Sequence, residues 1–359
     1  MSHLKLHIPG PVEVSERTFR AMSTPMVGHR GQDFQDLYGK LQPQLQELLD
    51  TKQLVFLSTS SAWGVMEGSI RNLVQKKVLN LCCGAFSDKW FDVSQRCGKE
   101  AEKIQVEWGQ AIDPESVRAK LSEGGFDTVT MVHNETSTGV MNPLAEIAEI
   151  VNGFEGVLLV VDSVSSFSAV PTPCDQLGID VLLAGVQKAM ALPPGLTVFV
   201  TSEAALARAE TTPDRGYYFD FIEFAKNDAK DNTPSTPAIA LLQALKQKVD
   251  SIMEEGLENR YARHAQNNAL VHAWVAAKGF EHFAPEGYRS KTLTAVANNR
   301  EIDVPAFVKA VRQKHNILIN GGYGKIKGKT FRISNMGNET AETMGEVLAA
   351  LDDVLPELP

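Results

Sequence analysis

Short apolar runs alternate with amphipathic stretches through most of the first 200 residues. The runs are Leu54–Leu57, Val78–Cys82, Thr128–Val132, Val157–Val161, Val181–Ala184 and Leu196–Val200. Continuous apolar runs of this length are typical of strands buried on both faces of a sheet. The stretches between them have helical spacing, as in 86–96 and 143–152. The alternation predicts an α/β fold with a mostly parallel sheet flanked by helices.

The pattern changes at both ends of this region. Residues 1–33 are rich in turn residues and predict an arm or loop with one short helix at 15–22, capped by Ser15. A leucine repeat at helical spacing follows, which Pro43 is expected to bend or delay. Residues 211–236 are polar and aromatic and predict a long loop, of the kind that is usually functional.

The last third of the chain predicts a separate, smaller unit. Residues 237–278 are helix-rich, and strands are expected near 291–295, 317–320 and 330–334. A chain of 359 residues is long for one core. We therefore predict an N-terminal arm (residues 1–14), a large domain (15–245) and a small α+β C-terminal domain (246–359).

Composition narrows the class of protein. The apolar fraction of 43% and the charged fraction of 22% are ordinary for a globular chain, and the net charge of −9 argues against nucleic acid as a partner. No apolar stretch is long enough to span a bilayer, so no membrane association is expected. The cysteines, at positions 82, 83, 97 and 174, have no metal-type spacing and form no disulfide framework. A cytoplasmic protein without a metal site is the simplest prediction.

Two strands are predicted to end in a charged group. The run 157–161 is followed by Asp162, and the run 181–184 is followed by Gly185 and then Lys188. Open α/β sheets bind ligands at the carboxyl ends of their strands. A carboxylate and an amine there suggest pyridoxal 5′-phosphate (PLP): the lysine would form a Schiff base, and the aspartate would keep the pyridinium nitrogen protonated. The alternative is a strand-end aspartate and an unrelated surface lysine.

Other features are expected at the same strand ends. Ser58–Trp63 lies where a strand turns into a helix, a place that binds phosphate or simply caps the helix. Phe86 could stack on a planar ring or belong to the core. The polar segment 133–139 could contact cofactor and substrate or be a solvated loop. Arg332, on an apolar strand, needs an anion, either a substrate carboxylate or a structural partner. No Gly-x-Gly-x-x-Gly follows a strand, so a nicotinamide or flavin site lacks its motif.

The ordered set of motifs resembles the class V, fold-type I PLP-dependent aminotransferases, in the group of the alanine–glyoxylate, serine–glyoxylate and serine–pyruvate enzymes. The resemblance covers nearly the whole chain. It rests on Gly10-Pro11, Ser58-Thr-Ser-Ser-Ala-Trp63, Gly84-Ala-Phe86, His133-Asn-Glu-Thr-Ser-Thr-Gly139, Asp162-Ser-Val-Ser-Ser166, Gly185-Val-Gln-Lys188, Thr233-Pro-Ser-Thr-Pro237 and Phe331-Arg-Ile-Ser334.

The resemblance implies a role for each site residue. Lys188 and Asp162 would be catalytic, as Schiff-base lysine and pyridine-nitrogen partner. The other cofactor-binding residues would be Ser61, Ala62, Trp63, Phe86, Thr136, Val164, Gln187 and Thr236, of which Ser61, Ala62, Trp63 and Gln187 cradle the phosphate. Relatives often have glycine at the position of Ala62. The loop ending at Thr236 would reach into the neighbouring subunit, which implies a homodimer with shared active sites.

The implied reaction is ping-pong transfer of an amino group from alanine or serine to glyoxylate or pyruvate. Arg332 would bind the α-carboxylate, with Gly10 and Thr136 also at the substrate. Arg30 on the N-terminal loop would either receive a second acidic group or pair with an acid such as Asp33. The first case would favour phosphoserine, aspartate or an aminophosphonate as substrate. A cysteine desulfurase is disfavoured because all cysteines precede Lys188, and a non-catalytic protein with this fold would not need Asp162, Lys188 and Arg332 together.

Overall fold

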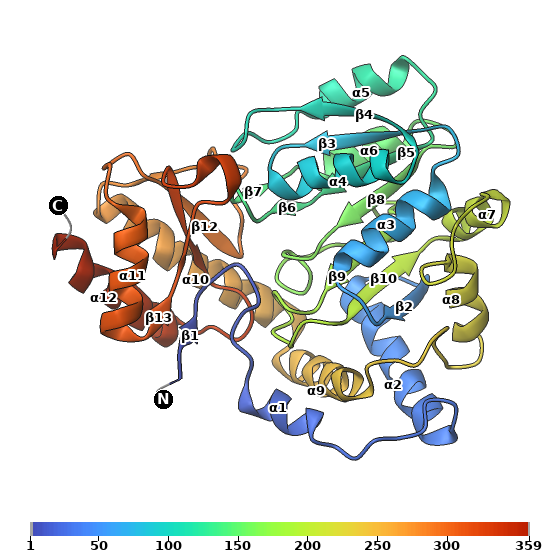
Figure 1. Cartoon of the computed structure of the whole chain (residues 1–359), viewed down its shortest axis with the longest axis horizontal. Coiled ribbons are helices and arrows are strands. Elements are labelled where there is room, and N and C mark those ends of the chain that lie inside the picture. The colour runs from blue at the N-terminus through green and yellow to red at the C-terminus, as the bar shows by residue number, and fades with distance from the viewer. Residues whose placement is uncertain (1–2, 358–359) are drawn as a thin grey trace.

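A seven-stranded sheet forms the centre of the larger part of the molecule, on the right in Figure 1; the computed structural model describes residues 3–357. The strand order is β2-β10-β9-β8-β5-β3-β4. The bounds are β2 Leu54–Ser58, β3 Lys77–Cys82, β4 Glu100–Gln105, β5 Thr128–Val132, β8 Leu158–Asp162, β9 Val181–Gly185 and β10 Thr197–Thr201. Strand β10 runs in the opposite direction to the other six strands, which confirms the mostly parallel α/β sheet.

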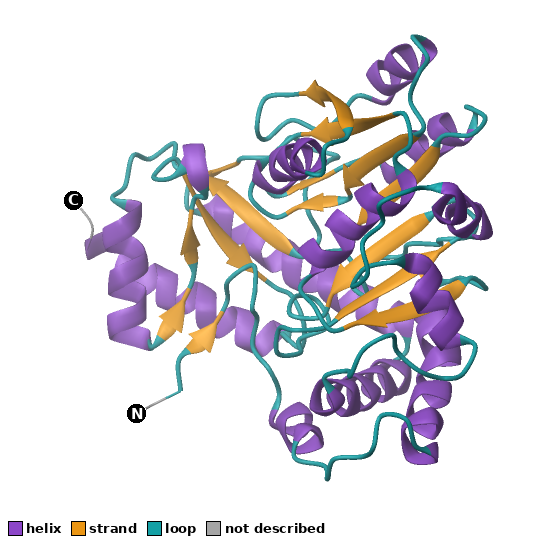
Figure 2. Cartoon of the chain, turned by 45° about the vertical axis from the view of Figure 1, so that its right-hand side comes forward, coloured by secondary structure: helices purple, strands orange, loops and turns teal. Residues whose placement is uncertain are grey.

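Side-chain alternation along these strands builds a separate core on each face of the sheet. Leu159 and Val161 of β8 pack into one apolar cluster, whereas Val160 packs into the other. Helices cover both faces, as Figure 2 shows. Those of this part are α2 Gln32–Leu49, α3 Ala62–Leu73, α4 Ala85–Arg96, α5 Pro114–Ser122, α6 Leu144–Asn152, α7 Glu203–Thr211, α8 Phe221–Asp228 and α9 Ile239–Glu255. Burial on both sides is the reason why these strands read as continuous apolar runs.

Strand β4 was not predicted from the sequence. Its residues 100–105 are mostly polar, and none is fully buried. It lies at the edge of the sheet and pairs only with β3. An edge strand can carry charged side chains because one side faces solvent, so it lacks the apolar signature of the central strands.

The predicted long loop at 211–236 is wrong in its middle, where helix α8 forms. Asp220 caps this helix, accepting a hydrogen bond from the backbone N–H of Ile222 at 3.0 Å. Phe221 and Phe224, three residues apart, both contact the ring of Phe199. The helix is short and has few apolar residues, so their helical spacing is hard to recognise within a mostly polar stretch of sequence.

The N-terminal segment follows its prediction more closely. Helix α1 (Glu16–Met22) is capped by Ser15, whose hydroxyl accepts from the N–H of Thr18 at 3.3 Å. Helix α2 continues through Pro43 without interruption. Strand β1 (Lys5–Leu6) is not part of the large sheet; it pairs with β13 of the small part.

The smaller part, on the left in Figure 1, is an antiparallel sheet of order β11-β12-β15-β14 packed against helices. Its elements are β11 Glu281–His282, β12 Leu293–Ala297, β13 Ile317–Leu318, β14 Asn320–Gly321, β15 Thr330–Ser334, α10 Leu257–Ala277, α11 Val304–His315 and α12 Ala341–Val354. Helix α10 leads from the large part into the small one. The predicted boundary at residue 245 falls within α9 and stays a prediction. Within residues 3–357, no helix combines the length and apolarity that a membrane span requires.

Candidate active site

Asp162 and Lys188 end neighbouring central strands and line one cavity. Strands β8 and β9 pair in parallel, so that Asp162 lies beside Leu183, and Lys188 follows in the turn after β9. The Lys188 ammonium donates to the Thr136 hydroxyl at 3.0 Å and lies 4.9 Å above the ring of Phe86. Asp162 accepts from the N–H of Val164 at 2.8 Å. The tertiary structure thus brings both charged groups into one enclosed space.

Burial changes the acidity of both groups in opposite directions. It raises the pKa of Asp162 to about 6, against the smaller opposing effects of the Val164 N–H and the Lys188 charge. It lowers the pKa of Lys188 to about 8, against the attraction of Asp162. The two groups form no direct ion pair within the described residues, although they line the same cavity. A buried carboxylate and a half-buried amine therefore line one cavity without pairing, which is unusual for a merely structural pair.

The first turn of α3 forms another wall of this cavity. Ser61 is its N-cap residue, and its side chain makes no capping hydrogen bond. Ala62 and Trp63 follow, and all three line the cavity with Gln187. Backbone N–H groups at a helix N-terminus favour an anion. The residue type at position 62 matters little for such binding, because the donors belong to the backbone.

Phe86 is held by a neighbouring carboxylate that the sequence did not single out. Glu135 is fully buried and accepts from the N–H groups of Phe86 (3.4 Å) and Ser87 (3.0 Å), at the start of α4. It also accepts from the hydroxyls of Ser87 and Ser137, at 3.0 and 2.6 Å. Gly84 makes room for it, since a Cβ there would lie 2.3 Å from the Glu135 side chain. Glu135 thus fixes the helix terminus that presents the Phe86 ring.

A second, adjoining cavity carries Arg332 and shares Lys188, Thr136, Phe86 and Gln187 with the first. Strand β15 places the Arg332 guanidinium at its wall, where it donates to the Thr136 carbonyl (3.0 Å) and the Gly321 carbonyl (3.1 Å). Burial lowers the pKa of Arg332 to about 10, so it stays charged at neutral pH. No carboxylate pairs with it in residues 3–357, which disfavours a purely structural salt bridge.

Gly10 closes this second cavity from the N-terminal arm. Its φ is +122°, and an added Cβ would lie 2.9 Å from the Cγ atom of Lys188. The next residues are tied to the same turn, because the N–H of Val12 donates to the Gln187 carbonyl at 3.1 Å. Glycine is needed here for close approach to the lysine.

Two predicted site residues lie outside both cavities of this chain. Arg30 is exposed and forms no ion pair with Asp33 within the described residues. Thr236 is also exposed, and its hydroxyl lies 3.5 Å from the Nε2 atom of His29. Every other predicted site residue lines one of the two cavities. The contribution of Arg30 and Thr236 to a site stays a prediction.

Some lining residues were not predicted individually. In the first cavity these are Met66, Val132, Asn134 and Ser165, and in the second Pro9, Pro11, Pro194, Asn320 and Tyr323. The ring of Tyr323 stacks on Phe86 at a centroid distance of 5.9 Å. Asn134 and Ser165 belong to polar segments that follow β5 and β8, a signal that was available. Asn320 and Tyr323 reach the site only through packing of the small part.

Comparison with known proteins agrees with this geometry. The model of the family "Aminotransferase class-V" matches residues 15–341. The serine–glyoxylate aminotransferase of Methylorubrum extorquens is 33% identical over 347 residues, 93% of this chain and 86% of its own length. The L-aspartate–glyoxylate aminotransferase of Paracoccus denitrificans is 30% identical over 362 residues, 98% of this chain and 91% of its own. The crystal structure of alanine–glyoxylate aminotransferase from Nostoc sp. superimposes with a TM-score of 0.93 at 29% identity, covering 99% of this chain and 96% of that one.

Proposed function

We propose, since the chain belongs to the class V aminotransferases, that it transfers an amino group from a small neutral amino acid to glyoxylate or pyruvate. The protein is a PLP-dependent transaminase of fold type I. The observation that carries the proposal is the pair of joined cavities with Lys188 at their junction.

The residues of the first cavity fit PLP. A half-buried amine and a buried carboxylate line one cavity without pairing, beside an aromatic ring and a helix N-terminus that favours an anion. Lys188 would hold the aldehyde, Asp162 the ring nitrogen, and Phe86 and Val164 the two ring faces. Ser61, Ala62, Trp63 and Gln187 would hold the phosphate, and Thr136 would donate a hydrogen bond. When bound, PLP supplies an electron sink for the bond that is broken at the substrate Cα.

The chain's own groups then have separable tasks. Arg332 binds the substrate α-carboxylate and so orients the Cα–H bond toward Lys188. Lys188 takes the Cα proton, because burial lowers the pKa of its amine to about 8 and leaves a useful neutral fraction near neutral pH. The Asp162 carboxylate, placed beside the ring nitrogen, would favour the protonated form of that nitrogen. Release of the keto acid and the reverse sequence with a second keto acid give ping-pong kinetics.

The walls of the second cavity favour a small neutral donor. Among the described residues that line it, the cationic side chains are Lys188 and Arg332, and three prolines and a glycine form part of its wall. One carboxylate is thus accommodated, with no second cation for an acidic side chain. The names of the serine and alanine enzymes support the same choice.

An acidic donor is the second candidate, because the Paracoccus denitrificans relative is named for aspartate. It would require a cation from outside the lining described here, and Arg30 of a neighbouring subunit would be the source. A cysteine desulfurase does not fit. Burial raises the pKa of both Cys82 and Cys174 to about 12, and no cysteine lines either cavity.

A homodimer with shared sites and a cytoplasmic location complete the proposal. The support for the dimer is that Arg30 and Thr236 are both exposed and line neither cavity of their own chain. Sedimentation at several protein concentrations tests it.

The decisive experiment is a single-turnover panel of amino donors. Each donor is added to PLP-loaded protein, and the visible band of bound PLP is followed as it disappears. We expect serine and alanine to bleach the band faster than aspartate or phosphoserine, and glyoxylate or pyruvate to restore it. A preference for aspartate or phosphoserine would replace the first candidate by the second. A band that resists sodium borohydride would overturn the Lys188 assignment.

A further inference from the structure

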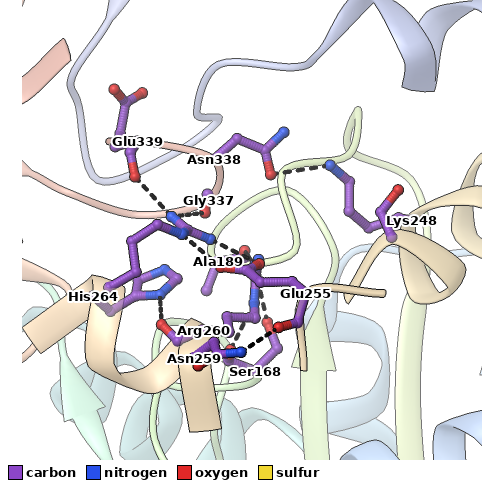
Figure 3. A network of polar contacts seen from close by, with 12 residues as sticks. Ser168, Ala189, Lys248, Glu255, Asn259, Arg260, His264, Gly337, Asn338 and Glu339 are labelled. Carbon is purple, nitrogen blue, oxygen red and sulfur yellow. Dashed lines mark hydrogen bonds and ion pairs between the residues drawn. The ribbon is translucent and has the colours of Figure 1, made fainter. Parts of the chain in front are cut away.

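A fully buried arginine lies beneath the turn that carries Lys188. Arg260, in the first turn of α10, is only 1% exposed. Its Nε atom donates to the Ser168 carbonyl at 2.8 Å, and its Nη2 atom donates to the Ala189 carbonyl at 2.7 Å (Figure 3). Its Nη1 atom pairs with Glu255 at 3.2 Å. The guanidinium therefore binds the residue after Lys188 and the loop after Asp162 at the same time.

Both loops need such support. Ser168 and Ala191 have φ values of +62° and +53°, a region that residues with a side chain rarely adopt. The turn of Lys188 is closed by the N–H of Ala191, which donates to the Lys188 carbonyl at 2.8 Å. A strained conformation persists only where its surroundings hold it. The planar fork of arginine can bind two carbonyls in fixed directions, which a lysine cannot.

The same network continues to the segment that follows Arg332. Glu255 accepts from Arg263 at 2.6 Å, and Arg263 donates to the carbonyls of Gly337 (3.2 Å) and Glu339 (2.7 Å). Gly337 packs directly on the Lys188 turn, since a Cβ there would lie 2.8 Å from the Cβ of Ala191. The network therefore connects the lysine turn to the end of the strand that carries Arg332.

Arg260 acts on Lys188 through geometry rather than through charge. The charges that act on the Lys188 amine are those of Asp162, Glu135 and Arg332. Within residues 3–357, the hydrogen-bond and ion-pair partners of the Arg260 side chain are two backbone carbonyls, the Ser168 hydroxyl and Glu255. Burial lowers the pKa of Arg260 to about 10, so it remains a cation at neutral pH and keeps all its donors.

We propose that Arg260 is a positioning residue for the reaction: it holds the Asp162 and Lys188 loops at one separation, so that the lysine amine faces the cavity. This inference rests on the proposed function of Lys188. It predicts that removal of the Arg260 guanidinium loosens the turn of Lys188 even when no cofactor is present.

The test compares Arg260→Met with a matched control, Arg208→Met. Arg208 also donates to several backbone carbonyls, those of Leu73, Asp127 and Gly156, but these precede β3, β5 and β8 and so lie at the amino ends of the strands, opposite to the site. For both variants we would measure amide hydrogen exchange of residues 186–192 in the cofactor-free protein. The PLP affinity of the cofactor-free protein, the pH midpoint of the visible band, kcat, KM and Tm complete the comparison.

We expect Arg260→Met to exchange faster at 186–192, to bind PLP at least about tenfold more weakly and to shift the pH midpoint of the band. Its kcat should fall more than its KM changes, because proton transfer depends on the amine and substrate binding on Arg332. Arg208→Met should lower Tm alone. If both variants match the wild type in exchange, affinity and midpoint, the proposal is overturned.

If Arg260→Met does not fold, Arg260→Lys provides the test instead. This substitution keeps the charge but has one ammonium for two carbonyls, so the same changes are expected in smaller size. Wild-type behaviour of Arg260→Lys in exchange and midpoint would overturn the proposal. A wild type without a borohydride-sensitive band would instead refute the proposed function, which keeps the two failures distinct.

Discussion

The strand-end cavity and the exposed loops around Arg30 and Thr236 are built in different ways. Asp162 ends β8 and is buried, whereas Lys188 follows the adjacent strand β9 and is half-buried; each is held by hydrogen bonds or by the network beneath it. The side chains of Arg30 and Thr236 are exposed, and the Thr236 hydroxyl lies 3.5 Å from the Nε2 atom of His29, next to Arg30. A group that many neighbours hold has one geometry within its own chain. The position of an exposed side chain depends instead on a second chain that packs over it.

The largest effect is expected at the buried end, from Lys188→Ala. One amine holds the cofactor and moves the substrate proton, so transamination should fall by at least about 10³-fold while the protein still folds. Lys248→Met is a suitable control, because Lys248 is a buried lysine that donates to Asn338 and lines neither cavity. Steady-state activity near that of the wild type would contradict the assignment of Lys188.

The next effect is expected from Asp162→Asn. An amide keeps the shape of the side chain but cannot hold the ring nitrogen protonated, so half-reaction rates should fall by about 10²–10³-fold. Measuring both the single-turnover rate and Tm shows whether Asp162 acts in the reaction or only in stability. A near-normal rate with a lowered Tm would mean that Asp162 is structural.

The same substitution changes how stability depends on pH in the cofactor-free protein. The pKa of Asp162 is raised to about 6 by burial, whereas an unfolded carboxyl titrates near about 4. Because the folded protein holds this proton more tightly, stability is greatest below about pH 4 and is lost as pH rises to about 6. The decline should amount to about 2–3 kcal/mol and be absent in Asp162→Asn. Urea unfolding between pH 4 and 7 measures it, and parallel curves for the two proteins would contradict it.

A smaller effect tests whether the exposed loops complete a neighbouring site. Lys188→Ala and a Thr236→Arg variant, each inactive alone, should regain activity when mixed and refolded together. Statistical mixing of a symmetric dimer leaves about a quarter of the sites intact. Mixtures that never regain activity, although the subunits exchange, would show that Thr236 acts within its own chain.

The smallest effect is expected from Arg30→Ala. With serine or alanine as donor, the loss of kcat/KM should be uniform and within about fivefold, as for an exposed charge. Assays with aspartate and phosphoserine provide the contrast. A wild type that prefers these acidic donors, with a selective collapse in the variant, would make Arg30 a substrate-binding residue and overturn the neutral donor.

The residues that the sequence identified best are those whose signal is local. Asp162 is the last residue of β8, and Lys188 and Ser61 each come three residues after a strand; strands buried on both faces have mostly apolar sequences that are easy to identify. Helix α8 and strand β4 were missed because a short helix and a solvent-facing edge strand have weak patterns. The class of fold, the family and the residues at the strand ends were therefore accessible from the sequence.

The tertiary structure decided what depends on distant contacts. Glu135 caps the helix that bears Phe86, Tyr323 stacks on that ring, and Arg260 binds carbonyls 92 and 71 positions away along the chain. No pattern in a single stretch marks such pairs, because each partner is ordinary in its own segment. The sequence determined which groups stand at the ends of the central strands, through the burial of those strands. Only the tertiary structure decided how these groups lie relative to one another, because the pairing of β8 with β9 places Asp162 near the lysine turn and Arg260 reaches that turn from a distant helix.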